Sequence, residues 1–260
     1  MNFCVAGGGS AAWIDAIKLW LADLKSTFIL CFVEDNRFER YMLSGLKATF
    51  IITICALIIG LILGVIVALV RVTHDKNIAT TRPGLGRVLL KFFNWLCQVY
   101  LTVFRGVPVV VQLLIWFFVI LAWVKNAMIT AVVAFGMNSG AYVAEIMRAG
   151  IMSVDGGQSE AGRSLGLNYV QTMRFIILPQ AFKNVLPTLC NECIVLLKET
   201  SVAGYISVTE LTKGAYIIVG RTYEAFMPLI ASALIYLVIV MFLAWIFGKL
   251  ERRLRASDQR

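Results

Sequence analysis

The sequence predicts an all-α membrane protein with about five membrane-spanning helices. Its 260 residues are 60% hydrophobic and 15% charged, with a mean hydropathy of +0.82, whereas soluble domains are roughly one-half apolar and one-quarter charged. Several apolar runs are long enough to cross a bilayer. The net charge is +9, but the basic residues gather beside these runs, a membrane pattern that argues against a nucleic-acid partner.

Residues 1–40 form a predicted N-terminal extension. Residues 13–33 are mostly apolar but carry four charged side chains and tryptophans, which favours an interfacial amphipathic helix over a span. No basic stretch precedes the apolar part, so we do not expect a cleaved signal peptide. The polar residues 34–40 separate this extension from the predicted transmembrane domain, residues 41–249.

The first span is predicted at residues 43–70, which are almost uncharged. Gly60 and Gly64 form a GxxxG motif that allows close helix contact, but such motifs are frequent in apolar helices and generic packing is the simpler interpretation. Residues 71–87 are predicted to be a polar connector. We expect His74 in this connector to be a solvated loop side chain, not a ligand or a base.

The second span is predicted at residues 88–124, with a break at residues 105–108. Glycine and proline at membrane depth produce a broken helix, whose freed backbone groups need partners inside the protein. A simple proline kink is the alternative interpretation.

The third span is predicted at residues 126–150, with polar residues toward its end. An ionisable side chain inside a span is costly and is normally functional or paired. Glu145 has the spacing to pair with Arg148, and the two side chains could instead lie in the interfacial zone. The polar residues on related faces of this helix are Asn138, Ser139, Tyr142 and Glu145.

Two further spans are predicted at residues 188–208 and 226–247. The first carries the sequence Lys198-Glu199-Thr200-Ser201, which either lines a translocation path or holds a structural ion pair between helices, and we favour the ion pair. Residues 210–224 are predicted to be a mixed segment between these spans. A basic tail follows at residues 250–260.

Residues 153–187 are neither plainly membrane-spanning nor plainly loop, and they predict two short helices joined by a hinge. Asp155 is a candidate N-cap of the first helix, with Gln158 reaching back to it as in a capping box. Gly166 stands where a left-handed C-terminal stop is expected.

A second helix is predicted to begin at Asn168, with Gln171 in the reciprocal capping position. Pro179 is expected to interrupt or bend this helix. On these features alone, an amphipathic helical hairpin on a membrane surface fits as well as a docking element does.

Several short motifs resemble those of ABC-importer permeases. The sequence Glu160-Ala161-Gly162, with Gly166 and Ile177-Leu178-Pro179, resembles the EAA loop of this family, with Gly162 in place of the usual second alanine. Further residues resemble the polar amino acid branch of the family. They are Gln158, Leu165-Gly166-Leu167, Gln180-Ala181, Leu186-Pro187, Phe104-Arg105-Gly106-Val107-Pro108 with Gln112-Leu113, Ala141-Tyr142 with Glu145 and Arg148, and Lys198-Glu199-Thr200-Ser201.

This resemblance implies the type I ABC importer permease fold, with residues 153–187 as a cytoplasmic coupling loop that docks on an ATPase subunit. The residues implied in coupling are Glu160, Ala161, Gly162, Gly166, Leu178 and Pro179. The substrate-pathway candidates are Gln112, Asn138, Tyr142, Glu145, Lys198, Thr200 and Ser201.

The same resemblance implies a partner set and a location. The expected partners are an ATP-binding subunit that holds ATP and Mg, an extracytoplasmic substrate-binding protein, a second permease chain and a polar amino acid substrate. The expected location is the bacterial cytoplasmic (inner) membrane. Basic residues in the 71–87 connector, the 153–187 segment and the C-terminal tail predict a multi-pass topology with the N-terminus outside and the C-terminus in the cytoplasm.

Known catalytic motifs are absent from the sequence. It has no GxxxxGK[S/T] phosphate loop, HExxH or Ser/His/Asp arrangement, so we expect no cofactor, metal or catalysis on this chain. Cys190 and Cys193 form a CxxC without a second pair, and we interpret them as small packed helix residues. The alternatives are a channel or secondary transporter with Glu145 and Lys198 on the ion path, and an intramembrane enzyme.

Overall fold

The computed structural model describes residues 10–78 and 83–256, and all regular structure within them is helical. The all-α class predicted from the sequence is therefore confirmed. Residues 1–9 of the predicted N-terminal extension, 79–82 of the predicted connector and 257–260 of the predicted tail lie outside the described residues. The main helices are α1 (Ser10–Phe28), α2 (Ser44–Asn77), α3 (Leu85–Gly106), α4 (Val109–Ile115), α5 (Ala127–Met152), α6 (Gly156–Ser164), α7 (Tyr169–Thr172), α8 (Leu178–Glu199), α9 (Leu211–Thr222) and α10 (Phe226–Ala256).

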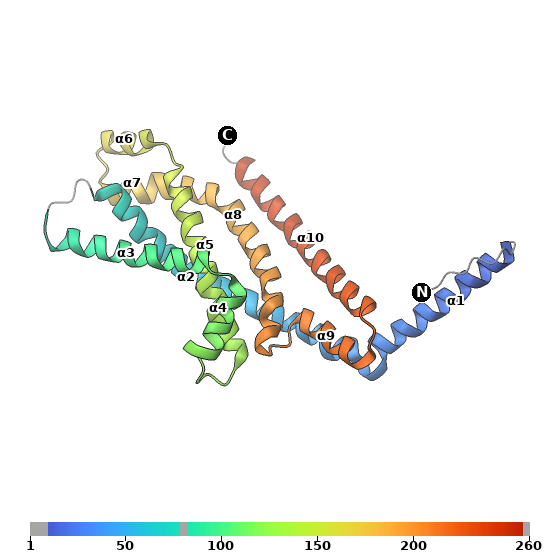
Figure 1. Cartoon of the computed structure of the whole chain (residues 1–260). Coiled ribbons are helices and arrows are strands. Elements are labelled where there is room, and N and C mark those ends of the chain that lie inside the picture. The colour runs from blue at the N-terminus through green and yellow to red at the C-terminus, as the bar shows by residue number, and fades with distance from the viewer. Residues whose placement is uncertain (1–9, 79–82, 257–260) are drawn as a thin grey trace.

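The N-terminal helix α1 projects away from the bundle formed by the other helices (Figure 1). Three short turns, η1 (Ile29–Val33), η2 (Glu34–Asn36) and η3 (Phe38–Leu43), join it to α2. The polar break predicted here contains a reversal in which Asp35 and Asn36 adopt φ values of 52° and 50°. Arg37 stabilises this reversal by donating to the Leu30 carbonyl and to the Asp35 carboxylate. The interfacial position of α1 stays a prediction.

Helix α2 is longer than its apolar stretch. It continues to Asn77, so His74 lies in its last turn and not in a connecting loop. The His74 ring is 3.3 Å from Asp75, and Asp75 in turn pairs with Arg148 of α5 at 3.3 Å. The Asp75–Arg148 pair therefore ties the polar end of α2 to α5.

The predicted second span is bent far more sharply than a proline kink. Helix α3 ends at Gly106, and α4 with the following turn η4 (Trp116–Ile120) leaves it at an angle of 111°. Pro108 precedes the first residue of α4 with an extended backbone conformation. The break predicted at residues 105–108 therefore divides two separate helices.

Helices α2 and α5 pack closely along faces that carry glycine. A Cβ added to Gly64 would lie 2.5 Å from Val143, and one added to Gly136 would lie 2.8 Å from Ile59. Gly60 likewise faces the backbone of Gly140. The GxxxG motif of α2 is thus a specific contact within the chain, matched by glycines four residues apart on α5.

Helix α8 begins ten residues before the predicted span at residues 188–208 and continues into η6 (Thr200–Ile206). Length and composition mark three helices within the described residues as membrane-spanning, Phe38–Lys76, Ala127–Met152 and Phe226–Arg253, and a fourth span if α3 and α4 are counted as one. Helix α8 is not among them, because charged and amide side chains along its length make its composition too polar.

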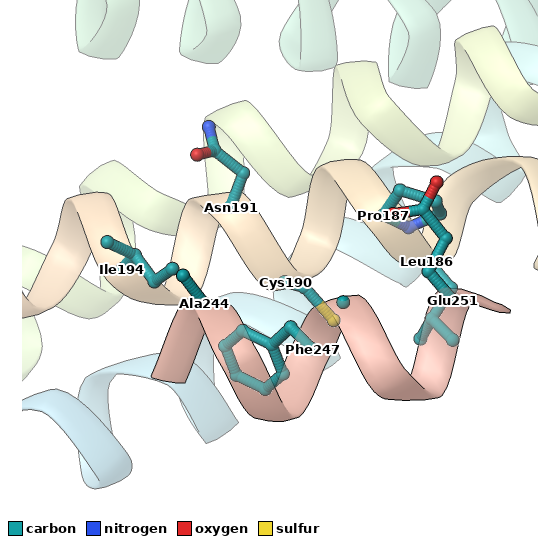
Figure 2. A pocket seen from close by; sticks show the side chains of 9 residues that line it. Leu186, Pro187, Cys190, Asn191, Ile194, Ala244, Phe247 and Glu251 are labelled. Carbon is teal, nitrogen blue, oxygen red and sulfur yellow. The ribbon is translucent and has the colours of Figure 1, made fainter. Parts of the chain in front are cut away.

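The C-terminal half completes the bundle. The mixed segment predicted at 210–224 forms α9, and α10 runs through most of the predicted tail to Ala256. Figure 2 shows Cys190 and Ile194 of α8 facing Ala244 and Phe247 of α10 around a cavity of 170 Å³. The C-terminal end of α10 lies at the same end of the bundle as α6 and α7, whereas α9 lies at the other (Figure 1).

Replacing Gly64 by alanine is expected to destabilise the fold, because α2 and α5 would have to separate to admit the new methyl group. Such overpacking costs about 1–3 kcal/mol, which titration of the purified protein with a denaturing detergent measures. Gly220→Ala on α9 is the control, since nothing lies within 4 Å of its added Cβ. Unchanged stability of G64A would contradict the close contact.

Candidate functional site

The segment over residues 153–187 is built by local capping. The Asp155 side chain accepts the Gly157 N–H at 2.6 Å and caps α6 as predicted. Gln158 does not reach back to complete a capping box, because its side-chain oxygen accepts a hydrogen bond from Gln180 at 3.2 Å. The expected local contact is thus replaced by one that ties α6 to α8.

The turn after α6 is a Schellman motif. Gly166 has the predicted left-handed conformation, with a φ of 77°. The N–H of Leu167 donates to the Gly162 carbonyl at 3.0 Å, and that of Gly166 donates to the Arg163 carbonyl at 2.9 Å. These two bonds satisfy carbonyls that the end of a helix leaves free, so the hinge between α6 and α7 is a defined turn.

The predicted second cap is confirmed. Asn168 and Gln171 form a reciprocal capping box at the start of α7, with both hydrogen bonds at 2.9 Å. The helix then widens into a π-helical turn, η5 (Met173–Ile177), before α8. Pro179 lies in the first turn of α8, directly after this π-helical turn, and it does not interrupt α8.

Gly162 faces inward. It is buried, and a Cβ at this position would lie 2.7 Å from Cγ2 and 2.8 Å from Oγ1 of Thr172. The absence of a side chain therefore serves the packing of α6 on α7. This contact with Thr172 explains why position 162 is glycine in this chain, where the family motif usually has alanine.

The outer face of the 153–187 segment carries both apolar and charged side chains. Glu160, Ala161, Leu178 and Pro179 are all exposed. Large apolar side chains on this face are exposed as well, at 76% for Leu165, 69% for Val170 and 63% for Phe175. An exposed apolar surface of this kind marks an interaction site on a folded protein.

The inner face of the same segment packs on the transmembrane helices. Val72 of α2 and Ile151 of α5 form one buried cluster with Ile177 and Ala181. Gly150 allows this contact, because a Cβ there would lie 1.9 Å from Val185 of α8. A displacement of the segment would therefore act directly on the ends of α2 and α5.

Gln112 closes the break between α3 and α4. Its amide nitrogen lies 2.8 Å from the Phe104 carbonyl and 2.7 Å from the Val107 carbonyl, the groups that the break leaves without helical partners. The same nitrogen lies 3.3 Å from the side-chain oxygen of Asn138 on α5. The predicted need for partners at the break is thus met by one side chain.

The polar contact continues from α5 to α8. Asn138 donates to Glu199 at 3.5 Å, and the hydroxyl of the adjacent, buried Ser139 donates to Glu192 at 2.9 Å, about two helical turns from Glu199 along α8. Gln112, Asn138, Ser139, Glu192 and Glu199 together form the polar core of the bundle. Glu192 was not predicted as a site residue, although its seven-residue spacing from Glu199 places both carboxylates on one face of α8.

The remaining pathway candidates lie in other places. Lys198 is exposed and takes part in none of the ion pairs formed by the described residues, so the favoured Lys198 ion pair is not present. Thr200 is buried and donates to the Leu197 carbonyl of its own helix. Ser201 lines a separate cavity beside Glu210 at the end of the bundle near α9.

Glu145 forms the predicted pair with Arg148, at 3.4 Å, and also lies 4.0 Å from Arg105 of α3. The Arg105 guanidinium lies over the ring of Tyr142. Tyr142 and Glu145 therefore belong to a charged cluster near one end of the bundle, apart from the polar core.

Comparison with known proteins identifies similar chains. The model of a family described as binding-protein-dependent transport system inner membrane component matches residues 84–256. The arginine transport system permease protein ArtQ of Bacillus subtilis is 40% identical over 84% of this chain and 94% of its own length. A putative glutamine transport system permease protein GlnP of Rickettsia bellii is 37% identical over 84% and 94%. The crystal structure of an amino acid ABC transporter with histidines superposes with a TM-score of 0.74 at 37% identity, covering 85% of this chain and 98% of that one.

Replacing Gln112 by leucine is expected to lower the stability of the protein, because two carbonyls at the break would lose their donor in an apolar environment. Leaving a buried polar group unsatisfied costs about 1–3 kcal/mol. Val111→Ala, at a neighbouring side chain that is 43% exposed, is the control in the same detergent titration. Equal effects of the two substitutions would show that Gln112 does not hold the break.

Proposed function

This chain belongs to the family of binding-protein-dependent transport system inner membrane components, and we propose that it couples ATP hydrolysis on a separate subunit to the uptake of polar amino acids. It is a permease subunit of an amino acid ABC importer. The family implies three kinds of partner: an ATPase, a substrate-binding protein and a second permease chain. ATP and Mg would bind to the ATPase and not to this chain.

The observation that carries the proposed coupling role is the two-sided 153–187 segment. Its outer face presents Glu160 and Ala161 beside exposed apolar side chains, while its inner face packs on α2 and α5. A surface held rigidly by two caps and a Schellman turn can receive a force from a partner and pass it on without unfolding.

The proposed topology places this segment in the cytoplasm. Arg163, Arg174 and Lys183 lie within it, and the ends of α2 and α10 that carry basic residues lie at the same end of the bundle (Figure 1). An excess of lysine and arginine marks the cytoplasmic side of a membrane protein. The N-terminus would then lie outside, and the protein would span the bacterial inner membrane.

The proposed movement runs from the 153–187 segment into the polar core. Helix α8 follows α7 through the π-helical turn η5, and its acidic face contacts Asn138 and Ser139 of α5. Closure of the ATPase would shift α8 against α5 and change which side of the membrane reaches the core. The substrate must bind the two arrangements with different affinity, since equal binding would shift nothing.

The proposed substrate class is a polar amino acid. Similar chains are named for the transport of arginine and of glutamine. Gln112, Asn138, Tyr142 and Glu145 offer amide, hydroxyl and carboxylate groups to such a molecule, and Glu199 adds a second carboxylate beside Asn138. These residues are assigned to the substrate pathway as a proposal.

Co-purification tests the proposal. The full chain, solubilised from its native membrane, should retain an ATP-binding subunit. Vesicles that contain the complex, supplied with its substrate-binding protein, should accumulate labelled arginine or glutamine only when ATP is present. Uptake that persists without the ATPase subunit would favour a channel or a secondary transporter.

Glu160→Lys is expected to uncouple transport, because it reverses the charge at the centre of the exposed face of α6. Juxtaposed like charges cost several kcal/mol at an interface, so ATP-driven uptake should fall by about tenfold or more. Glu39→Lys, an exposed charge reversal in η3 at the other end of α2, should leave uptake unchanged. Normal uptake and normal ATPase retention in E160K would contradict the coupling role.

A further inference from the structure

An open cavity of 450 Å³ lies where α2, α3 and α5 meet, close to the bend after Gly106. Five of its lining residues recur on one face of α3 at helical spacing, and the other two come from α2 and α5. The polar and charged side chains that line it are Arg71, Gln98, Thr102, Arg105 and Glu145. It therefore combines two guanidinium groups, a carboxylate, an amide and a hydroxyl.

Both arginines keep donors for a ligand. Arg71 donates to Asn94 at 3.3 Å through one terminal nitrogen, while its Nε is buried without a hydrogen-bond partner. The Arg105 side chain is 46% exposed, and its Nη1 lies 4.0 Å from Glu145 Oε1. That distance is beyond a hydrogen bond. Paired guanidinium groups in one cavity suit a carboxylate, which accepts from them in parallel.

Glu145 also keeps capacity for a ligand. Its Oε2 lies 3.4 Å from Arg148, but Arg148 is also 3.3 Å from Asp75. The positive charge of Arg148 is thus shared between two carboxylates. The other oxygen of Glu145, Oε1, faces Arg105 across the wider gap and can accept from a cationic donor.

We propose that this cavity is a binding subsite for the zwitterionic backbone of an amino acid, an inference that rests on the proposed function. The α-carboxylate would bind Arg71 and Arg105, and the α-ammonium would bind Glu145, with Gln98 and Thr102 adding hydrogen bonds. Opposite charges 4.0 Å apart suit a ligand whose own charges are equally close, as they are across one carbon atom in an α-amino acid. Under the proposed topology this subsite lies on the cytoplasmic side of the polar core, where substrate leaves.

Such a subsite would recognise the α-carboxylate and α-ammonium groups of an amino acid and not its side chain. Different amino acids should bind to it with similar affinity, whereas a molecule that lacks the α-carboxylate or the α-ammonium should bind poorly. Selection among side chains would then fall to other parts of the importer.

Equilibrium binding to the purified permease–ATPase complex in phosphatidylcholine nanodiscs tests the proposal. Labelled L-arginine and L-glutamine should both bind. Agmatine and 4-aminobutanamide, their counterparts without the α-carboxylate, should compete at least about tenfold less well, because they lose the charge-assisted interactions with both arginines. The N-acetyl derivatives, which lack the ammonium charge, should also compete poorly. Failure of both amino acids to bind, or equal competition by the decarboxylated molecules, would overturn the subsite.

The variants Arg71→Gln and Arg105→Gln should each weaken amino acid binding by about tenfold and reduce the preference over agmatine, because each removes one of the two guanidinium partners of the α-carboxylate. Lys91→Gln, which removes an exposed charge on α3 outside the cavity, is the matched control. Because Arg105 is exposed, R105Q is expected to fold and gives a result even if R71Q does not. Unchanged binding in R105Q would overturn the proposal.

Two further outcomes separate the alternatives. A co-purified phospholipid that R105Q loses, with amino acid binding unchanged, would assign the cavity to a lipid headgroup and overturn the proposal. ATP-driven uptake by the wild-type complex is measured in parallel. Normal uptake with unaffected R105Q binding would reject this subsite alone, whereas loss of ATP dependence in the wild type would reject the proposed function.

Discussion

The close approach of α2 and α5 is the contact on which the rest of the bundle depends. Gly60 and Gly64 on α2 face Ser139 and Val143 on α5, and Gly136 on α5 faces Ile59 on α2, so each helix admits a side chain of the other where it has none itself. In a lipid environment helices gain little from burying apolar surface, because lipid tails are equally apolar, and close packing through small residues supplies the association. This contact positions Asn138 and Ser139 toward α4 and α8.

A second constraint follows from the membrane itself, since backbone groups at membrane depth must find partners inside the protein. The bend of 111° between α3 and α4 frees carbonyls, and the Gln112 amide serves two of them while reaching Asn138. The bend and the polar core are therefore parts of one arrangement. A change in the angle between α3 and α4 would alter the hydrogen bonds on α5 and, through Glu199, those on α8.

The 153–187 segment joins this core to a surface that a partner can reach. Its caps and its Schellman turn are local, but its position depends on the buried cluster that includes Val72 and Ile151. Gly162 belongs to both the local turn and the packing, because its missing side chain lets α6 lie against Thr172. The exposed apolar face that results is costly in water, and this cost is consistent with a surface that a partner covers.

The sequence by itself determined the all-α membrane class, the break after Gly106 and the turn at Gly166. These features depend on apolar runs, helix breakers and capping side chains, which act on neighbouring residues along the chain. The sequence also predicted the capping box formed by Asn168 and Gln171. The sequence did not determine that Pro179 would lie in the first turn of α8, because the π-helical turn before α8 depends on how the helix packs.

Only the tertiary structure decided which residues meet across the bundle. The partner of the GxxxG motif, the pairing of Ser139 with Glu192 and the cavity that holds Arg71, Arg105 and Glu145 all join residues far apart in the chain. Such contacts depend on helix crossing and rotation, which local spacing does not specify. For the same reason Lys198 and Glu199, adjacent in the sequence, have different surroundings: one side chain points outward and the other toward Asn138.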